Sequence, residues 1–351
     1  FDNTWFMIDG QTRPMLRMEH STTLTNANQL QLMTLAPGRD YRLANDISLA
    51  AINRERGLWR AGFALVGDES TGAAFSGSLD GASNAVTGLA VNVERDVVDG
   101  LFGDVDNATV TNLRLHDVTI ISGNGVGGDD GRLNISAGVT LAGNVMLDAG
   151  DANLSVKGSI GTQDSLAGTV FVSGTEIALS DVLSSGAQTY TKTSSAPERI
   201  TLNSNLVSAG KAITLMGPVT LGDAVTIDTT NAGAQPTGNS ILLNSTLDSA
   251  QGETNALTLR AGAGSVTVLG NAGENQALGA VTIESAKYFT WVGSVKAASL
   301  VQSSRSDGSF VLSKGVTVTH GDIDIQTTGL ALLGPVINES AGDISISADA
   351  I

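Results

Sequence analysis

The sequence predicts an all-β protein, a right-handed parallel β-helix with a short helical segment near its N-terminus. Three observations support this prediction: a glycine-rich and aromatic-poor composition, many three-residue runs of apolar, polar and apolar residues, and frequent short turns between them. The chain has 42 Gly but only 6 Pro, and aromatic residues make up 4% of it while hydrophobic residues make up 41%. Small aliphatic side chains must therefore build the core, and the turns must be numerous.

The most regular part of the chain is residues 132–351, where a polar residue repeatedly stands between two apolar ones. In a strand, this order turns two side chains inward and one outward. A three-residue strand is not stable alone, but it is when the chain winds into coils of roughly 20–25 residues and each strand pairs with its equivalent in the next coil. The runs include 200–202, 213–215, 219–221, 225–227, 257–259, 266–268, 281–283, 316–318, 323–325 and 344–346.

Three further segments precede these repeats. Residues 1–56 form an N-terminal segment, a cap or an insertion, in which Thr25 or Asn26 can cap a short helix that continues to Met33. Residues 57–122 are predicted coils, since the apolar and polar residues between Val110 and Ile120 largely alternate. Residues 123–131 are a predicted loop or boundary, because five of the nine are Gly.

A β-sandwich is the structural alternative. It would favour longer strands and a core with more aromatic side chains than this chain provides. The strands predicted here are too short and too frequent for that architecture, so the β-helix is preferred.

Charge and cysteine content exclude several classes of function. The formal net charge is −16 and the basic residues form no stripe, which argues against a nucleic-acid partner. No apolar stretch approaches the roughly 20 residues of a membrane span, and no signal peptide is visible. The sequence starts at Phe1 and not at Met, so we expect a processed or partial chain. The chain has no Cys, which excludes disulfides, thiol nucleophiles and zinc–thiolate sites.

One part of the sequence resembles a known motif. The run Phe75-Ser76-Gly77-Ser78-Leu79-Asp80-Gly81 is followed by Gly100-Leu101-Phe102-Gly103 and by Asn112-Leu113. This order resembles the GLUG-motif region of bacterial exoproteins, and residues 132–351 are similar to the repeats of filamentous-haemagglutinin-like adhesins.

This resemblance implies two-partner secretion through an outer-membrane transporter and a location at the bacterial cell surface or in the extracellular biofilm matrix. It also implies a role in cell adhesion or aggregation. The Asn-Pro-Asn turn of the family's secretion domain is missing, which argues that this piece is not the part that guides export.

Aromatic side chains are the candidate ligand-binding residues. Stacking on sugar rings needs exposed aromatics, and in so aromatic-poor a chain they would be conspicuous. Tyr288, Trp291 and Trp5 are the candidates for binding extracellular polysaccharide or cell-surface glycans. Alternation puts Tyr288 and Thr290 on one face of their strand, and Phe289 and Trp291 on the other.

Asp129 and Asp130 are the candidate metal ligands, since carboxylates on a glycine-rich turn suit Ca²⁺. A repeat-type Ca²⁺ site needs its motif to recur at a fixed spacing, and here it occurs once and imperfectly. A solvated loop is therefore the preferred interpretation of these residues, and no cofactor is otherwise implied.

The leading functional hypothesis is a non-enzymatic structural adhesin segment, a rigid β-helical stalk. A carbohydrate-binding module is the alternative, and self-association through open coil ends is a further expectation. A polysaccharide-active enzyme would need paired carboxylates, for which Asp129 with Asp130 or Asp322 with Asp324 are the candidates.

Overall fold

The structure is a computed structural model. It describes residues 4–8, 12, 14–49, 63, 66–67, 74–93, 101–102, 108–122, 132–135, 139–150, 153–195, 199–303, 306–332 and 334–350. The chain divides into two compact units, one of residues 1–167 with 171–175 and the other of residues 168–170 with 176–351. We call them unit 1 and unit 2.

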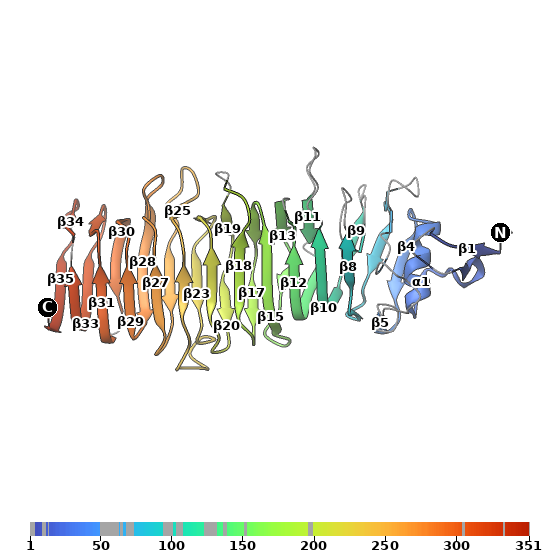
Figure 1. The fold of residues 1–351 in the computed structure, drawn as a ribbon, viewed down its shortest axis with the longest axis horizontal. Coiled ribbons are helices and arrows are strands. Elements are labelled where there is room, and N and C mark those ends of the chain that lie inside the picture. The colour runs from blue at the N-terminus through green and yellow to red at the C-terminus, as the bar shows by residue number, and fades with distance from the viewer. Residues whose placement is uncertain are drawn as a thin grey trace. The chain divides into compact units, whose positions relative to one another are not determined.

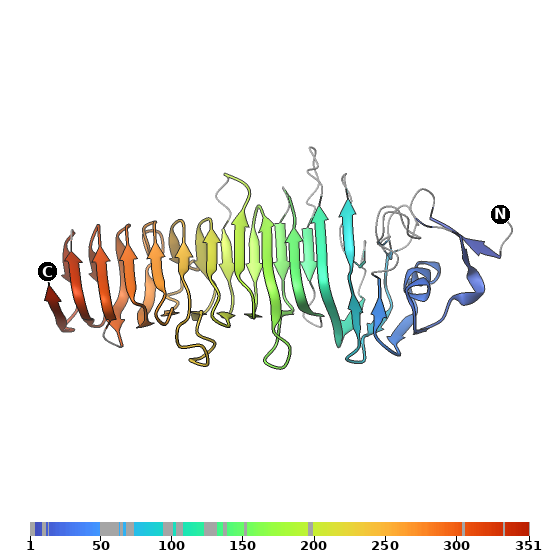
Figure 2. The ribbon, with the colours of Figure 1, turned by 60° about the horizontal axis from the view of Figure 1, so that its bottom comes forward.

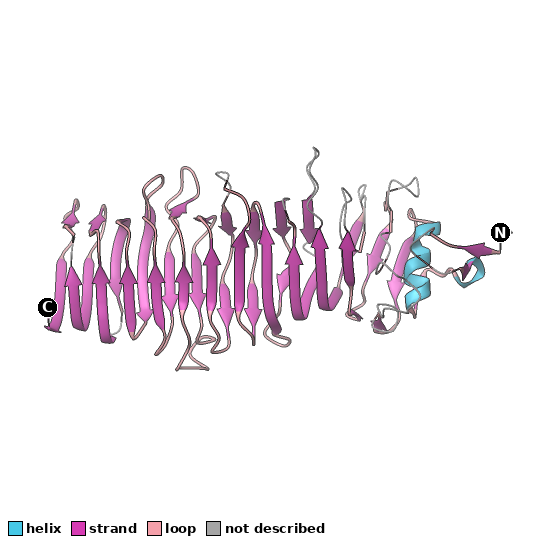
Figure 3. Ribbon diagram, in the orientation of Figure 1, coloured by secondary structure: helices cyan, strands magenta, loops and turns pink. Residues whose placement is uncertain are grey.

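Both units are built almost entirely of parallel strands, and the predicted parallel β-helix with a short helical segment is confirmed. Of the residues that the structure describes, Figure 3 shows helices near the N-terminus and strands and loops in the rest. Among the described residues, no helix is long and apolar enough to cross a membrane.

Unit 1 begins with the antiparallel pair β1 and β2 and continues with coils of parallel strands. Its elements are β1 (Trp5–Phe6), β2 (Met15–Leu16), η1 (Arg17–Glu19), β3 (Thr23–Leu24), α1 (Ala27–Leu32), η2 (Met33–Leu35), β4 (Asp40–Leu43), β5 (Ile47–Ser48), β6 (Ser78–Asp80), β7 (Ala85–Thr87), β8 (Ala90–Val93), β9 (Thr109–Thr111), β10 (Leu113–Ser122), β11 (Arg132–Ile135), β12 (Val139–Asp148), β13 (Asn153–Val156) and β14 (Ser159–Ile160). The residues of β15 (Ala167–Gly174) are divided between the two units.

The predicted helix is α1, and its cap is the second of the two candidates. The Asn26 side chain accepts a hydrogen bond from the backbone N–H of Gln29 at 3.0 Å, which satisfies one of the free donors of the first turn. Leu30 and Leu32 are fully buried. The helix therefore turns its apolar side chains into unit 1. The short helix η2 follows it, and Pro37-Gly38 comes after η2.

The GLUG-like run shows why its glycines are required. A Cβ on Gly77 would lie 1.9 Å from the carbonyl oxygen of Arg39, and one on Gly81 would lie 2.3 Å from that of Asn112. Backbone from neighbouring coils thus presses on both positions. The Asp80 carboxylate accepts hydrogen bonds from the side chain of Asn112 and the amide of Ala82, and these bonds lower its pKa.

Unit 2 winds through three columns of parallel strands, and Figures 1 and 2 show successive strands lying side by side along the stack. The first contains β18 (Gln188–Lys192), β21 (Ile213–Met216), β24 (Ile241–Leu243), β27 (Ser265–Val268), β29 (Tyr288–Trp291) and β31 (Ser306–Leu312). The second contains β17 (Val182–Ser184), β20 (Leu206–Ser208), β23 (Val225–Asp228), β26 (Leu257–Arg260), β28 (Leu278–Ser285), β30 (Val295–Gln302), β33 (Ile323–Leu332) and β35 (Ile344–Ala350). The third contains β16 (Ile177–Leu179), β19 (Ile200–Leu202), β22 (Val219–Leu221), β25 (Leu247–Ser249), β32 (Val316–Val318) and β34 (Val336–Asn338), and β30 also pairs with β32.

The core of unit 2 follows from the short triplets. In Ile200–Leu202, Val219–Leu221 and Val316–Val318 the first and third residues are buried and the middle one is partly exposed. The number of residues per coil varies more widely than the predicted 20–25. Ile200 pairs with Val219, 19 residues further along the chain, whereas Val225 pairs with Leu257, 32 residues further along. Loops of different length between the strands absorb the difference, because a loop on the outside does not disturb the stack.

Candidate functional site

The described outward side chains of the first column carry no carboxylate, ammonium or guanidinium group, and we call the surface that they form the uncharged face. It runs over six successive coils, from β18 to β31. Its described side chains are Thr189, Thr191, Thr214, Met216, Ser240, Leu242, Asn244, Ser265, Thr267, Leu269, Tyr288, Thr290, Val292, Ser309, Val311 and Ser313. In a chain of net charge −16, sixteen described outward side chains without a carboxylate, ammonium or guanidinium group set this surface apart, although Lys192 ends β18 and Lys287 stands beside Tyr288.

The alternation of the strands produces this face. In β27 the burial pattern places Val266 and Val268 inside and Ser265 and Thr267 outside. In β29 it places Phe289 inside and Thr290 outside. Because parallel strands stack in register, Thr267 lies directly beside Thr290, at the roughly 4.8 Å spacing of neighbouring strands.

Tyr288 is the exposed aromatic of the uncharged face, with 48% of its surface accessible. Its neighbour in the preceding coil is Ser265, whose hydroxyl lies 3.3 Å from that of Ser240. The ammonium of Lys287 lies 5.4 Å from the centre of the tyrosine ring. A Cβ on Gly308 would lie 3.0 Å from Cδ1 of the ring, so the ring leans toward the following coil over a residue that has no side chain.

Leu269 and Val292 form an exposed apolar pair along one border of the same face. They follow β27 and β29 directly, and each continues the ladder, since their amides donate to Leu243 and Val268 respectively. Their exposed fractions are 41% and 37%. Asn244 occupies the equivalent place one coil earlier, and it is exposed.

Trp291 corrects one prediction, because it is not an exposed aromatic. It is fully buried, and its indole N–H donates to the carbonyl of Gly270 at 3.2 Å. Phe289 lies beside it and stacks on Phe310 of the next coil with ring centres 4.4 Å apart. The period-2 pattern correctly paired Trp291 with Phe289 but could not say which face pointed inward.

The other predicted site residues lie elsewhere. Trp5 is in unit 1, where it is 41% exposed and its carbonyl accepts a hydrogen bond from the guanidinium of Arg17. Asp129 and Asp130 lie outside the described residues, so the Ca²⁺ site stays a prediction. Within the described ranges, no group of three or more His, Cys, Asp or Glu side chains could hold a metal ion.

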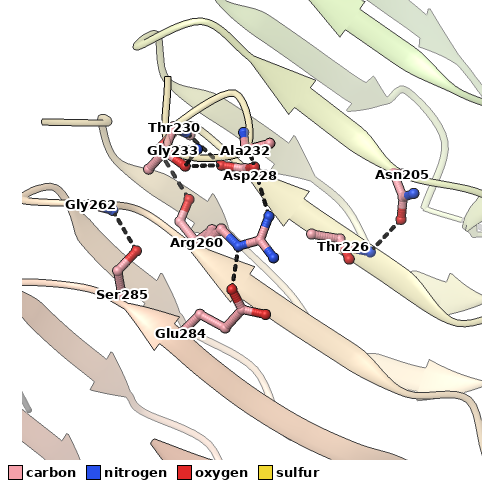
Figure 4. Close-up of polar contacts among 11 residues, drawn as sticks. Asn205, Thr226, Asp228, Thr230, Ala232, Gly233, Arg260, Gly262, Glu284 and Ser285 are labelled. Atoms are coloured by element: carbon pink, nitrogen blue, oxygen red, sulfur yellow. Dashed lines mark hydrogen bonds and ion pairs between the residues drawn. The ribbon is translucent and has the colours of Figure 1, made fainter. Parts of the chain in front are cut away.

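The second column carries a different surface, which we call the charged face, defined by Asp228, Arg260 and Glu284 (Figure 4). Asp228 is buried and accepts hydrogen bonds from the amide and hydroxyl of Thr230 and from the amide of Ala232, at 2.6–2.8 Å. Arg260 pairs with Asp228 at 3.3 Å and with Glu284 on its other side. The bond to Glu284 is the main reason that the pKa of Arg260 is raised.

These contacts join successive coils. Asp228, Arg260 and Glu284 belong to β23, β26 and β28, so one guanidinium bridges three coils. Figure 4 also shows the amide of Thr226 donating to the side chain of Asn205 and the amide of Gly262 donating to Ser285. On this face the polar side chains are therefore used to hold the stack and the loop after Asp228.

The third column repeats this use of a buried carboxylate. Asp248 pairs with Arg199 at 2.9 Å and accepts bonds from the amide and side chain of Asn275. In the second column, Asp322 accepts a bond from the amide of Asp343. Asp322, one member of the candidate catalytic pair Asp322 and Asp324, thus holds a turn of the next coil in place.

Comparison with known proteins gives a match over part of the chain. A stretch of 137 residues is 30% identical to Halomucin from Haloquadratum walsbyi, and it covers 38% of this chain but 1% of Halomucin. The chain therefore corresponds to a very small part of that protein. No family model matches the chain, and no solved structure matches it.

The sequence did not predict Leu269, Val292 and the threonines as parts of one surface. A signal was present, since 240–244, 265–269 and 288–292 are three runs without a charged residue. To recognise the surface, one must know which residues of these runs lie beside each other in successive coils. The loops between the runs differ in length, so this alignment cannot be read from the sequence.

Proposed function

We propose that this chain is a non-enzymatic structural segment of a secreted or cell-surface adhesin, and that the uncharged face is the surface it presents for adhesion or aggregation. The observation that carries the proposal is a difference between the faces of unit 2 in how their outward side chains are used. Asp228, Arg260 and Glu284 of the second column and Asp248 of the third are engaged in holding coils and loops. The first column instead leaves Tyr288, Leu269 and Val292 exposed, whereas the exposed Ile337 and Ile344 of the other columns lie in the last two strands, β34 and β35.

The hydrogen bonding and packing of the fold support a structural role. Every coil of the described stack pairs with the next through backbone hydrogen bonds, and the interior is filled by aliphatic and stacked aromatic side chains. Such a stack gains stability from each neighbour interface. A rigid scaffold also holds its surface groups in fixed positions, which lowers the entropy lost on binding.

The secreted or surface location and the export route have different support. The similarity to Halomucin is compatible with a surface or secreted location. Two-partner secretion through an outer-membrane transporter rests on the resemblance to filamentous-haemagglutinin-like adhesins alone.

The test is adhesion by beads coated with the whole chain. We expect the beads to attach to cells or to matrix material, or to aggregate, and we expect a charge placed on the uncharged face to reduce this. Beads that attach no better than beads coated with an unrelated acidic protein would contradict the proposal. Cleavage of a glycan by the purified chain would replace it with the enzymatic alternative.

A further inference from the structure

We infer that the uncharged face binds an electrically neutral, linear polysaccharide that runs along the axis of the coil stack. This inference rests on the proposed function and gives its partner a chemical class. Three properties of the face lead to it: its repetition along one direction, its lack of charge and its size.

The face repeats along the direction of stacking. Leu242, Thr267 and Thr290 are successive members of one row of outward side chains, and Asn244, Leu269 and Val292 are the parallel row beside it. Each row therefore offers similar groups at every coil, roughly 4.8 Å apart. A linear polymer with repeating units can meet such a row in several places at once, and many weak contacts then add up.

The chemistry of the rows suits a sugar chain. A pyranose ring has apolar C–H groups and a rim of hydroxyls. Leu269, Val292 and the ring of Tyr288 provide exposed apolar contacts, since each is more than a third accessible. The threonines and Asn244 provide hydroxyl and amide groups that both donate and accept hydrogen bonds.

The absence of charge selects a neutral polymer. A charged group laid on the two rows of side chains would lose hydration without meeting an opposite charge within the rows, which is costly. Lysines do border the face: Lys192 ends β18, Lys314 follows Ser313, and the ammonium of Lys287 lies 5.4 Å from the centre of the Tyr288 ring. They are the reason to test an anionic polysaccharide as the competing outcome.

The size of the face argues against a second copy of the chain as its partner. Six strands about 4.8 Å apart and five residues at about 3.3 Å each give a flat footprint of roughly 480 Å². A stable protein–protein interface buries about 800 Å² on each partner. A narrow chain of a few sugar units matches this footprint better than the broad interface of a stable protein complex does.

The experiment is affinity electrophoresis of the whole chain in gels containing a neutral β-glucan, a neutral galactomannan, alginate or hyaluronan. We expect at least one neutral polymer to retard the chain, and we expect this retardation to change less than twofold between 0.05 and 0.5 M salt, because uncharged contacts are not screened. Retardation by the anionic polymers alone, falling with salt, would assign the binding to the lysines and overturn the inference. So would no retardation by any polymer.

Two matched variants locate the binding. Thr290→Asp places a charge at the centre of the uncharged face, and Thr258→Asp places the same charge at the middle of β26 on the second column, where Thr258 is also partly exposed. We expect Thr290→Asp to weaken retardation at least tenfold and Thr258→Asp to change it less than twofold, with both melting as cooperatively as the parent. Equal effects of the two variants would contradict the inference.

The milder variants Leu269→Ser and Val292→Thr keep the surface uncharged, and we expect each to weaken retardation threefold to tenfold. Unchanged retardation in both would remove these side chains from the site. If coated beads still adhere and Thr290→Asp abolishes that adhesion while no polysaccharide binds, the proposed function stands and the polysaccharide inference fails.

Discussion

The uncharged face and the charged face of unit 2 share one construction on the inside and differ on the outside. In both, alternate residues of each strand are buried, as in β27 of the first column and β26 of the second. Outside, the first column shows Thr267 and Thr290, whereas the second shows Arg260 between two carboxylates. The stack can therefore be assembled without charges, and ion pairs are an addition to it.

This difference separates two uses of surface residues. Arg260 and Asp228 form hydrogen bonds within the chain, to neighbouring coils and to the loop that begins at Thr230. Leu269 and Val292 differ from them, because more than a third of the surface of each is accessible to solvent. Residues of the first kind should matter for stability, and residues of the second kind for contact with a partner.

The largest effect is expected inside the first column. Trp291→Ala should lower the free energy of unfolding by about 3–5 kcal/mol, since it removes a large buried side chain and leaves a cavity. Thr290→Ala, one residue away but outward, should change it by less than about 0.5 kcal/mol. Urea unfolding of both variants measures this contrast, and similar losses would mean that the inward and outward assignments of β29 are wrong.

A smaller loss is expected from the charged face. Asp228→Ala should cost about 2–4 kcal/mol, because it removes a buried acceptor of several bonds and one partner of Arg260. Hydrogen exchange should also become faster at the amides of Thr230 and Ala232. Unchanged exchange at these amides would show that Asp228 does not hold the loop.

The outer ion pair should be weaker still. Glu284→Gln should cost about 0.5–1 kcal/mol at low ionic strength, because about a third of each partner's side chain is accessible. This loss should shrink in 1 M salt, where a partly exposed pair is screened. A loss that is independent of salt would indicate packing by the Glu284 side chain in place of charge.

The smallest effect on stability is expected on the uncharged face. Leu269→Ser and Val292→Ser should each change the free energy of unfolding by less than about 0.5 kcal/mol, as is usual for accessible positions. Thermal melts of the two variants check this. A loss above about 1 kcal/mol would show that these side chains support the stack and would weaken their assignment as contact residues.

The sequence predicted the architecture because its local signals agree with the global fold. The triplet at 200–202 and its equivalents show which residues alternate, and the cap at Asn26 was visible three residues before Gln29. The orientation of Trp291 was not predictable from its own strand. It is decided by Val268 and Leu312 in the neighbouring coils, with which it pairs.

The uncharged face was hidden for the same reason. Its members lie in six strands separated by loops of unequal length, so the surface exists only once the register is known. Asp228 and Asp248 were also not distinguishable in the sequence from solvated acids. Their burial depends on Arg260 and Arg199, which are 32 and 49 residues away.

Hydroxyl-radical footprinting of the chain, free and attached to cells or matrix material, tests the central claim most directly. We predict protection on the uncharged face, at Tyr288, Leu269 and Met216, and no change on the charged face, at Arg260 and Glu284. Protection at Arg260 and Glu284 with Tyr288 and Leu269 left open would contradict the claim that the uncharged face is the contact surface.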